Sequence, residues 1–325
     1  MNAEVTIPGI TADQLRLHQI FFPYAFQKTI AAIQKKSRFV HYTSAETAVR
    51  IFQDQEVWMR KSSFMNDFME IEYGIELLSA NYKSGRDKIG DIFDKMFPGF
   101  LEKLEGRFNG WLPHFRTDTY IACLSEHDDG EDRLGRLSMW RAYGGATGVA
   151  IVLNGAPMVA ATDALKAYTS PVAYLNAGKF ETEFQRLLSS VAQNADFVKA
   201  KGEDVALANM FAAFRAAILC TKHPGFHEER EWRVIYSPSF QKSDRLIADL
   251  KTIRGVPQPI CRIPLRDAPE ENLVGIELPS FIERVIIGPT QFPEAIREAF
   301  VSMLSDAGMS DANSRVFISD IPLRT

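Results

Sequence analysis

The sequence predicts a single α+β domain with a helical insertion, and three observations carry this prediction. Short segments rich in β-branched and aromatic residues recur along the chain, separated by helical patterns. Two helical spans near 178–200 and 203–221, rich in Ala and Phe, indicate an insertion at about 178–221. No internal repeat, low-complexity tract or interdomain linker divides the chain. We therefore expect one domain over 38–325, preceded by a leader of irregular and helical pieces over 1–37.

Size and composition place the chain among ordinary globular proteins. Its 325 residues can bury a sizeable core, and 46% of them are hydrophobic and 24% charged. No apolar run approaches the roughly 20 residues that span a bilayer, and the N-terminus carries no secretion signal pattern. A formal net charge of -4 argues against a protein that binds mainly by neutralising phosphates. We expect no membrane contact, although nucleic acid remains open as a substrate.

The cysteines and histidines form no disulfide or metal pattern. Cys123, Cys220 and Cys261 are far apart and odd in number, which suits a reducing cytoplasm. Neither they nor the six histidines have the spacing of metal ligands, so we expect a cytoplasmic protein without a bound metal. Cys123 lies in the apolar run 120–124, where a buried, inert thiol is expected.

A strand over 39–42 opens the regular part of the chain. Thr43-x-x-Glu46 fits a capping box, in which a hydroxyl and a carboxylate satisfy the first free N–H groups of a helix. This helix would run to about Gln55. The elements expected next are, in order, a strand at 57–59, a loop at 61–70 and a helix near 71–78.

The middle of the chain alternates helices and strands around two breaks. Residues 85–112 have helical spacing, but Pro98-Gly99 should divide them into two pieces. Gly144-Gly145 should end a short helix. The other elements expected here are a core strand at 120–124, a charged loop at 126–136, the short helix at 137–143 and a strand at 148–153.

The C-terminal third predicts short strands around one helix. Proline and glycine at 255–259 and 288–289 mark turns. The expected strands are 260–263, 274–278, 285–287 and 316–319, and the expected helix covers about 293–307.

Glu229 and Glu231 stand two residues apart, where a charged segment runs into a β-branched and aromatic one. The alternation predicts a strand, which would place both carboxylates on one face, with Arg230 and Trp232 on the other. Such crowding raises the pKa of at least one carboxylate unless cations or hydrogen bonds compensate, which is typical of active sites. A solvated strand face, with the acids paired to Arg230 and Arg233, would explain the same pattern.

Three further clusters combine polar and aromatic residues at the ends of predicted elements, where binding residues collect. They are His41-Tyr42-Thr43, Asn66-Asp67 with Glu70, and Trp140-Arg141 with Tyr143. Each also has a structural interpretation, with Thr43 and Asp67 as helix caps and the aromatic rings as packing. His41 closes an apolar strand with both donor and acceptor capacity, so it could bind a ligand or be a satisfied core histidine.

The ordered set of motifs resembles the bacterial family defined by the domain of unknown function 2971. The matching pieces span about 40–324, in the family's order. They are His41-Tyr42-Thr43-Ser44, Asn66-Asp67-x-x-Glu70, Cys123-x-Ser125, Met139-Trp140-x-x-Tyr143, Gly148-Val149-Ala150-Ile151, Glu229-x-Glu231-Trp232-Arg233, Gly288-Pro289 and Ser319-x-Ile321-Pro322-x-Arg324. One departure is Phe68, where the family usually has proline, and it affects the expected local turn.

The order of these parts also resembles, more remotely, the ADP-ribosyltransferase superfamily. The shared features are an early strand with His-Tyr-Thr, a helix after it, and a late strand with Glu-x-Glu. The resemblance implies a split, mixed or antiparallel β-sheet core with a helical insertion, and NAD as co-substrate. It also implies ADP-ribosyltransferase or NAD glycohydrolase activity, as in bacterial effectors or phage-defence toxins.

The resemblance assigns catalytic roles to residues of the matching motifs. His41 would hold the NAD ribose, and Tyr42 or Tyr143 would stack on nicotinamide. Glu231 would be the catalytic carboxylate, because cleavage of the bond to nicotinamide builds a cation that a carboxylate stabilises. Glu229 would then orient the acceptor.

Other motif residues would contact the rest of NAD. Arg141 or Arg233 could bind the pyrophosphate, because a planar guanidinium suits bidentate phosphate binding. Thr43, Asn66 and Trp140 are the remaining expected contacts of NAD or a related nucleotide. No glycine-rich phosphate loop is present, which argues against a Rossmann cofactor site.

Two other function classes stay open on the sequence. Asp67, Glu70, Glu229 and Glu231 could hold Mg²⁺ in a metal-dependent phosphodiesterase or nuclease, although no nuclease motif is present. In a non-catalytic ligand-binding module, the acids and Trp232 would instead form a structural ion-pair network. For a transferase, the acceptor could be water, protein, nucleic acid or a small molecule.

Overall fold

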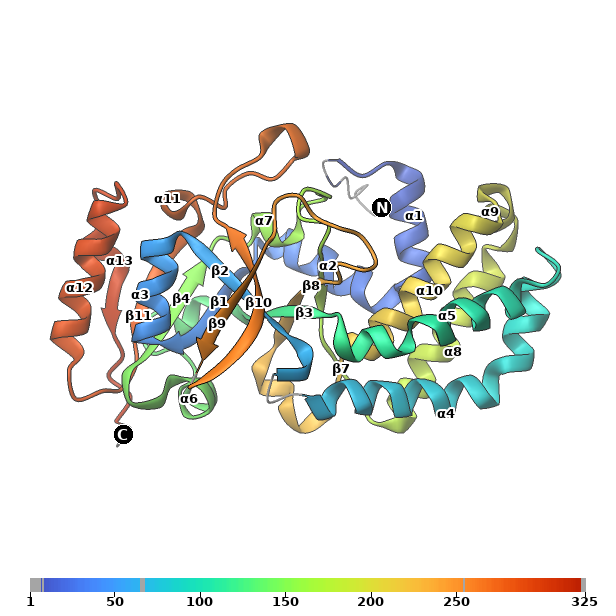
Figure 1. The fold of residues 1–325 in the computed structure, drawn as a ribbon, viewed down its shortest axis with the longest axis horizontal. Helices are drawn as coiled ribbons and strands as arrows, with labels where there is room; N and C mark the ends of the chain where they lie inside the picture. The colour runs from blue at the N-terminus through green and yellow to red at the C-terminus, as the bar shows by residue number, and fades with distance from the viewer. Residues whose placement is uncertain (1–6, 8, 65–67, 254, 323–325) are drawn as a thin grey trace.

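The structure is a computed structural model that describes residue 7 and residues 9–64, 68–253 and 255–322. A mixed, open sheet with α3 and α12 against it occupies one end of the elongated molecule, and long helices pack together at the other end (Figure 1). The predicted α+β class is confirmed. The leader contributes two helices, α1, which packs against α8 and α10 at the helical end, and α2, which lies near the middle of the molecule.

The large sheet has its strands in the order β12-β11-β4-β1-β3-β2-β10-β9, and β8 with β5 branches from β3. The β11–β12 pair is parallel and the other pairs described in this sheet are antiparallel. The strands are β1 (Arg38–Ser44), β2 (Glu56–Lys61), β3 (Tyr120–His127), β4 (Gly148–Leu153), β5 (Tyr168–Pro171), β6 (Ala173–Tyr174), β7 (Thr221–Lys222), β8 (Glu231–Tyr236), β9 (Ile247–Ile253), β10 (Val256–Pro264), β11 (Ile282–Ile287) and β12 (Val316–Ile318).

The helices range from single turns to long rods. They are α1 (Ala12–Phe21), α2 (Pro23–Lys35), α3 (Ala45–Asp54), α4 (Phe68–Phe93), α5 (Phe100–Thr117), α6 (Leu137–Met139), α7 (Ala156–Val159), α8 (Ala177–Gln193), α9 (Ala195–Lys201), α10 (Glu203–Leu219), α11 (Leu278–Phe281), α12 (Pro293–Asp306) and α13 (Ala312–Arg315). Short turns are η1 (Ser62–Phe64), η2 (Asp129–Glu131), η3 (Trp140–Gly144, π-helical), η4 (Gly145–Thr147), η5 (Pro224–Glu229) and η6 (Pro269–Glu271).

The sheet forks along β3. One edge of β3 pairs with β8 through residues 120–125. The opposite edge is shared by two strands: β1 pairs with residues 125–127, and β2 pairs with residues 120–121. Within the described residues, 122–124 of β3 therefore have no strand beside them on that edge. The backbone groups left at the fork need other partners.

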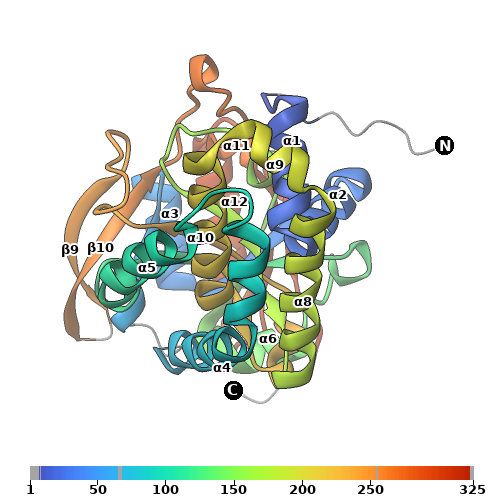
Figure 2. The ribbon, with the colours of Figure 1, turned by 90° about the vertical axis from the view of Figure 1, so that its right-hand side faces the viewer.

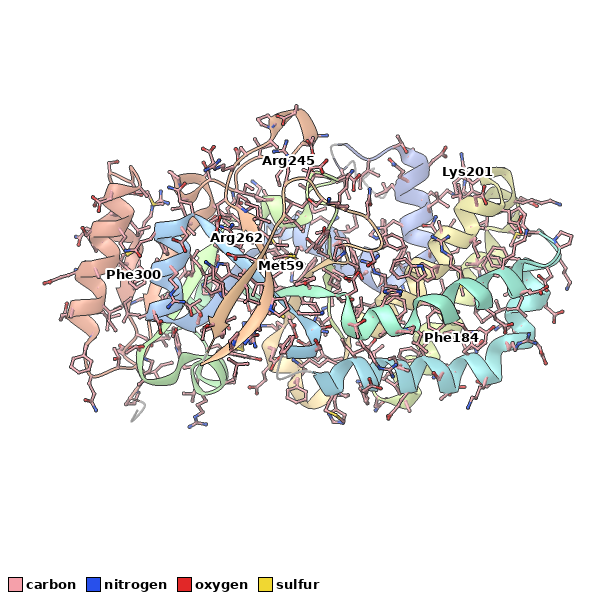
Figure 3. All side chains as sticks on the ribbon, viewed as in Figure 1. Met59, Phe184, Lys201, Arg245, Arg262 and Phe300 are labelled. Carbon is pink, nitrogen blue, oxygen red and sulfur yellow. The ribbon has the colours of Figure 1, made fainter. Side chains whose placement is uncertain are left out.

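Two large apolar clusters hold the molecule together, one at each end. The helical cluster is built around residues such as Phe184 on α8 and Phe211 on α10. The other lies between the sheet and helices α3 and α12, where Phe52 packs edge-to-face on Phe300. Figure 3 labels Phe184 and Phe300 at the two ends, with Met59 of β2 between them. Ile121 and Ile235, on β3 and β8, join the sheet to the helical cluster.

The expected helical region at 178–221 is present as α8, α9 and α10. Asn194 and Gly202 separate the three helices, so the first predicted span is divided in two. Helices α4 and α5 pack against this region, and Figure 2 shows α4, α8 and α10 side by side. The break predicted at Pro98-Gly99 falls between α4 and α5 and is confirmed.

Two boundary predictions near α3 and α4 were wrong. Ser44, not Thr43, caps α3, because its Oγ accepts the N–H of Thr47 at 3.3 Å while Thr43 is still paired within the sheet to Val149. The helices predicted at 71–78 and from 85 form one continuous helix, α4. Packing against α8 and α10 keeps the polar stretch between them helical.

The strand predicted at 274–278 is absent, because the Asp267 side chain takes the backbone groups that a strand would need. Its carboxylate accepts the N–H groups of Gly275, Ile276 and Glu277 at 2.9 to 3.3 Å. The chain then enters the short helix α11. Strands β5 and β9 were not predicted, because their residues do not alternate clearly between apolar and polar.

Gly74 is required where α4 crosses α10. A Cβ at Gly74 would lie 2.4 Å from the Ile218 carbonyl oxygen and 2.8 Å from its Cα, whereas a Cβ at Gly106 in α5 would meet nothing within 4 Å. We expect Gly74→Ala to lower the free energy of unfolding by about 1–3 kcal/mol through overpacking. Gly106→Ala should raise it by about 0.5–1 kcal/mol through helix propensity. Urea unfolding measures both, and equal shifts of the two variants would contradict this prediction.

Candidate functional site

A pocket of about 180 Å³ lies at the fork of the sheet. Its lining comes from β1, β2, β3, the α6–η3 turn, the end of η5 and the start of β8. The ionisable and hydroxyl-bearing side chains in this lining are His41, Tyr42, Arg60, Cys123, Ser125, Tyr143, Glu229 and Glu231. A larger cavity of about 310 Å³ is lined mainly by apolar side chains such as Leu153 and Trp232. The pocket at the fork is therefore the stronger candidate for chemistry.

Both glutamates reach this pocket, although not from one strand. Strand β8 begins at Glu231, while Glu229 ends the turn η5 and Arg230 between them has a positive φ of 44°. The predicted strand through Glu229 was therefore wrong. Arg230 turns away to pair with Asp128 and Glu131.

A buried lysine joins the two carboxylates. The Nζ atom of Lys222 lies 2.6 Å from an oxygen of Glu229 and 3.2 Å from an oxygen of Glu231. Its side chain is only 1% exposed. Lys222 is the last residue of β7, directly after helix α10. This contact brings the carboxylates together in place of the predicted strand alternation.

Glu231 is the more deeply held of the two acids. Its side chain is 5% exposed, and its carboxylate lies 2.8 Å from Nε of Arg233 as well as near Lys222. Burial by itself would raise the pKa of Glu231, but the charges of Arg233 and Lys222 outweigh burial and hold that pKa at about 2. Its backbone N–H donates to the Tyr174 hydroxyl at 2.8 Å. Glu231 is thus ionised and fixed.

Glu229 is closer to solvent than Glu231, and its pKa is displaced in the opposite direction. Its side chain is 15% exposed, and its carboxylate accepts the Tyr143 hydroxyl proton at 3.0 Å. Burial raises the pKa of Glu229, and the nearby charge of Glu231 adds to this effect, while Lys222 and Tyr143 oppose it. The two acids therefore have pKa values displaced in opposite directions, an arrangement typical of paired functional carboxylates.

His41 forms a hydrogen bond with the backbone at the fork. Its Nδ1 lies 3.2 Å from the carbonyl oxygen of Cys123, on the edge of β3 between the parts that pair with β1 and with β2. A carbonyl only accepts, so Nδ1 carries the proton and Nε2 of the neutral ring is an acceptor. Burial lowers the pKa of His41 and favours this neutral form. The residue satisfies the backbone, as the structural interpretation required, and it also lines the pocket, where ligand binding stays a prediction.

The aromatic residues of the motifs divide into packing and accessible rings. Tyr42 is 6% exposed, packs edge-to-face on Trp140, and accepts the Arg136 N–H at its hydroxyl. The Trp140 ring is 2% exposed and donates Nε1–H to the Leu134 carbonyl. Neither ring is free to stack along its whole face on a ligand. Tyr143 is 38% exposed and lines the pocket, so it is the better stacking candidate.

The residues expected to bind pyrophosphate lie outside the pocket lining. Arg233 is buried behind Glu231, and its Nη1 donates to the Leu219 carbonyl at 2.7 Å. Arg141 is exposed on η3, and Thr43 lies farther along β1. Asn66 and Asp67 lie outside the described residues, as does the side chain of Glu70.

Three cationic residues of the site were missed by the sequence analysis. Lys222 is one, and Arg60 on β2, which lines the pocket, is the second. Arg136 is the third, because it braces the turn before β8 by donating to the carbonyls of Glu228 and Glu229. Lys222 could have been noticed in the sequence, because it is a single lysine after the apolar run that forms α10. Nothing local marks Arg60 or Arg136.

Cys123 is half-buried and lines the pocket, so the buried position predicted from its apolar run was wrong, while its inertness stays a prediction. Within the described residues, no group of three or more His, Cys, Asp or Glu side chains is arranged to hold a metal ion. No helix in the described part of the chain is both long and apolar enough to cross a membrane.

The fold and site define an α+β protein with a forked mixed sheet and a pocket built on two carboxylates. Residues 139–234 match the model of a family described as Protein of unknown function (DUF2971). This match confirms the family resemblance over that stretch, which includes Tyr143, Glu229 and Glu231. Comparison with curated proteins and with solved structures gave no match. The resemblance to ADP-ribosyltransferases stays a prediction.

Glu231 should make stability depend on pH. Because its pKa is about 2 in the folded chain against an ordinary value of 4.5, its contribution is complete above about pH 4.5 and is lost as the pH falls toward 2. Glu231→Gln leaves Arg233 and Lys222 under-compensated, so we expect it to lower the free energy of unfolding at pH 7 by about 3–5 kcal/mol. The variant should also lose this part of the pH dependence.

Urea unfolding at pH 7 and at pH 3 measures both effects. Glu46→Gln, which removes an exposed ion pair with Arg50, is the control and should change little. A wild-type and a Glu231→Gln protein with parallel pH profiles would refute the assignment.

Proposed function

We propose that the protein cleaves the bond between nicotinamide and ribose in NAD, as an ADP-ribosyltransferase or an NAD glycohydrolase. The observation that carries the proposal is that His41, Tyr143 and both glutamates line one pocket. Such a reaction needs a carboxylate and a ribose-binding group within reach of one sugar. Residues from β1, η3, η5 and β8 meet at the fork, which supports the proposal.

The chemistry divides among these residues as follows. The glycosidic bond breaks, its electron pair leaves with nicotinamide, and the anomeric carbon becomes cationic. The negative carboxylates stabilise that cation. The acceptor, water or another nucleophile, then attacks the anomeric carbon and gives its proton to a carboxylate. Nε2 of His41 would accept a hydrogen bond from a ribose hydroxyl, and Tyr143 would pack on the nicotinamide ring.

The contacts favour Glu229 as the reacting carboxylate, in place of the role first expected for Glu231. Glu231 is neutralised on both oxygens by Arg233 and Lys222. Glu229 is nearer to solvent, and its raised pKa suits a group that takes up a proton from the acceptor. Glu231 is then a positioning residue, because it holds the lysine that Glu229 contacts.

The size of the pocket limits what can enter. Pockets that enclose a whole drug-sized ligand have volumes of about 300–1,000 Å³. At about 180 Å³, this pocket suits one ring and part of a sugar. The nicotinamide riboside end of NAD would enter, and the adenosine end would lie outside it. Arg141, exposed on η3 next to Tyr143, remains the proposed contact for the pyrophosphate.

The two competing classes receive less support. For a metal-dependent phosphodiesterase, Mg²⁺ would have to displace Lys222 and Arg233 from the carboxylates. For a non-catalytic ligand-binding module, the ion pairs of Glu231 are what a structural network requires. That class does not explain the displaced pKa of Glu229 or its contact with Tyr143 at a pocket wall.

Incubation of the full chain with NAD should release nicotinamide, measured by chromatography, with and without cell extract as a source of acceptor. Glu229→Gln should reduce the rate by about 10²–10³-fold, because it removes the charge that stabilises the cation. His41→Asn should weaken NAD binding. Glu228→Gln, which alters the exposed neighbouring acid, should leave the rate unchanged.

Release that persists in Glu229→Gln while failing in Glu231→Gln, with both variants folded, would return the reacting role to Glu231. A wild-type chain that neither releases nicotinamide nor gains thermal stability with NAD would remove the proposal. Rescue of another hydrolytic activity by Mg²⁺, abolished by EDTA, would favour the phosphodiesterase.

A further inference from the structure

Strand β9 forms the outer edge of the large sheet. It pairs with β10 on one side, and no strand in the described part of the chain pairs with its other side. Figure 2 shows β9 on the outside of the molecule. Leu250 is 66% exposed and Ile247 is 40% exposed. An edge with unpaired backbone groups and exposed apolar side chains is a template for pairing with another strand.

The prolines of β10 show which backbone groups of β9 face outward. In an antiparallel ladder, residue pairs that exchange both hydrogen bonds alternate with pairs that exchange none. Pro257 and Pro259 have no N–H to donate, so their partners Thr252 and Leu250 occupy non-bonded pairs and direct their N–H and C=O groups away from β10. In agreement, the Leu250 N–H donates to the Asp249 carboxylate at 2.7 Å.

We propose that β9 pairs antiparallel with β9 of a second copy of this chain, with Leu250 facing Leu250 across the two-fold axis. This register places Asp249 of each copy opposite Lys251 of the other. It also places Ile247 opposite Ile253. The strand is therefore self-complementary in charge and in shape, which identifies a second copy as the occupant of the edge.

The proposed register also satisfies the backbone. The Leu250 N–H would leave the Asp249 carboxylate, to which it donates in the single chain, and the two Leu250 residues would exchange a pair of hydrogen bonds. Ala248 of each copy would do the same with Thr252 of the other, which gives about six bonds between the strands. The charged pairs fall on the non-bonded positions, where opposed side chains lie closest. In its own chain Asp249 lies 3.2 Å from Lys251 and 3.2 Å from Arg262 of β10, so the Lys251 of the second copy would add a further cation beside it.

Other registers that use the same outward groups fit less well. Centring the pair on Ala248 would place Lys251 opposite Arg245 of the second copy, and like charges directly opposed are destabilising. Centring it on Thr252 would place Lys251 opposite Ile253 and Asp249 opposite Gly255, so neither charge would face an opposite charge of the second copy. The register centred on Leu250 is the one that matches both charges.

Sedimentation equilibrium of the full chain tests the proposal, over roughly 1–300 µM, where weak specific contacts associate. We expect the mass to rise from 36.6 kDa toward twice that value. Asp249→Lys and Lys251→Asp should each weaken association by at least about tenfold, because like charges then face each other twice. A mixture of these two variants, and the double variant Asp249→Lys/Lys251→Asp, should restore association.

Backbone variants supply an independent readout. Leu250→Pro removes an outward N–H without disturbing the ladder to β10, and it should abolish association, while Leu250→Ala should retain it. Circular dichroism and thermal unfolding confirm that each variant is folded. A wild-type chain that stays monomeric throughout the range would overturn the proposal. So would a dimer that survives both Leu250→Pro and the single charge variants, because it would use another surface.

Discussion

The buried ion-pair network around Glu231 is the interaction on which the site depends. Lys222, Arg233 and the two glutamates are held in contacts of 2.6 to 3.2 Å, with little exposure to water. Removing such charges from water costs several kcal/mol per ion, and mutual pairing offsets that cost only when the geometry is kept. The network therefore fixes the end of α10, the turn η5 and the start of β8 relative to one another.

The fork in the sheet creates a small pocket beside this ion-pair network. Because β1 and β2 separate along β3, a small pocket opens beside the carboxylates, and a backbone carbonyl is left without a strand partner. His41 satisfies that carbonyl, which fixes its tautomer and leaves Nε2 as an acceptor. The same constraint that stabilises the fork therefore leaves an acceptor nitrogen on a residue of the pocket lining, and the family match at 139–234 covers Met139, Tyr143, Glu229 and Glu231 of that lining.

Much of the fold could be predicted because its signals are local. The break at Pro98-Gly99, the helices of 178–221 and the strand after Gly148 follow from residues that act on their own neighbours. The errors arose where a distant group took over. Asp267 binds the backbone that would have formed a strand at 274–278, and packing of α4 on α8 and α10 joined two predicted helices into one.

By itself, the sequence determined which residue types could carry chemistry and predicted that Glu229, Glu231 and His41 act together. Only the tertiary structure decided that they share a pocket, that Lys222 joins the two acids, and that Glu229 is the more accessible one. The physical reason is that pKa and exposure depend on charges and packing contributed by segments far apart in the chain. The spacing of residues along one strand therefore determines neither the pKa nor the exposure of a side chain.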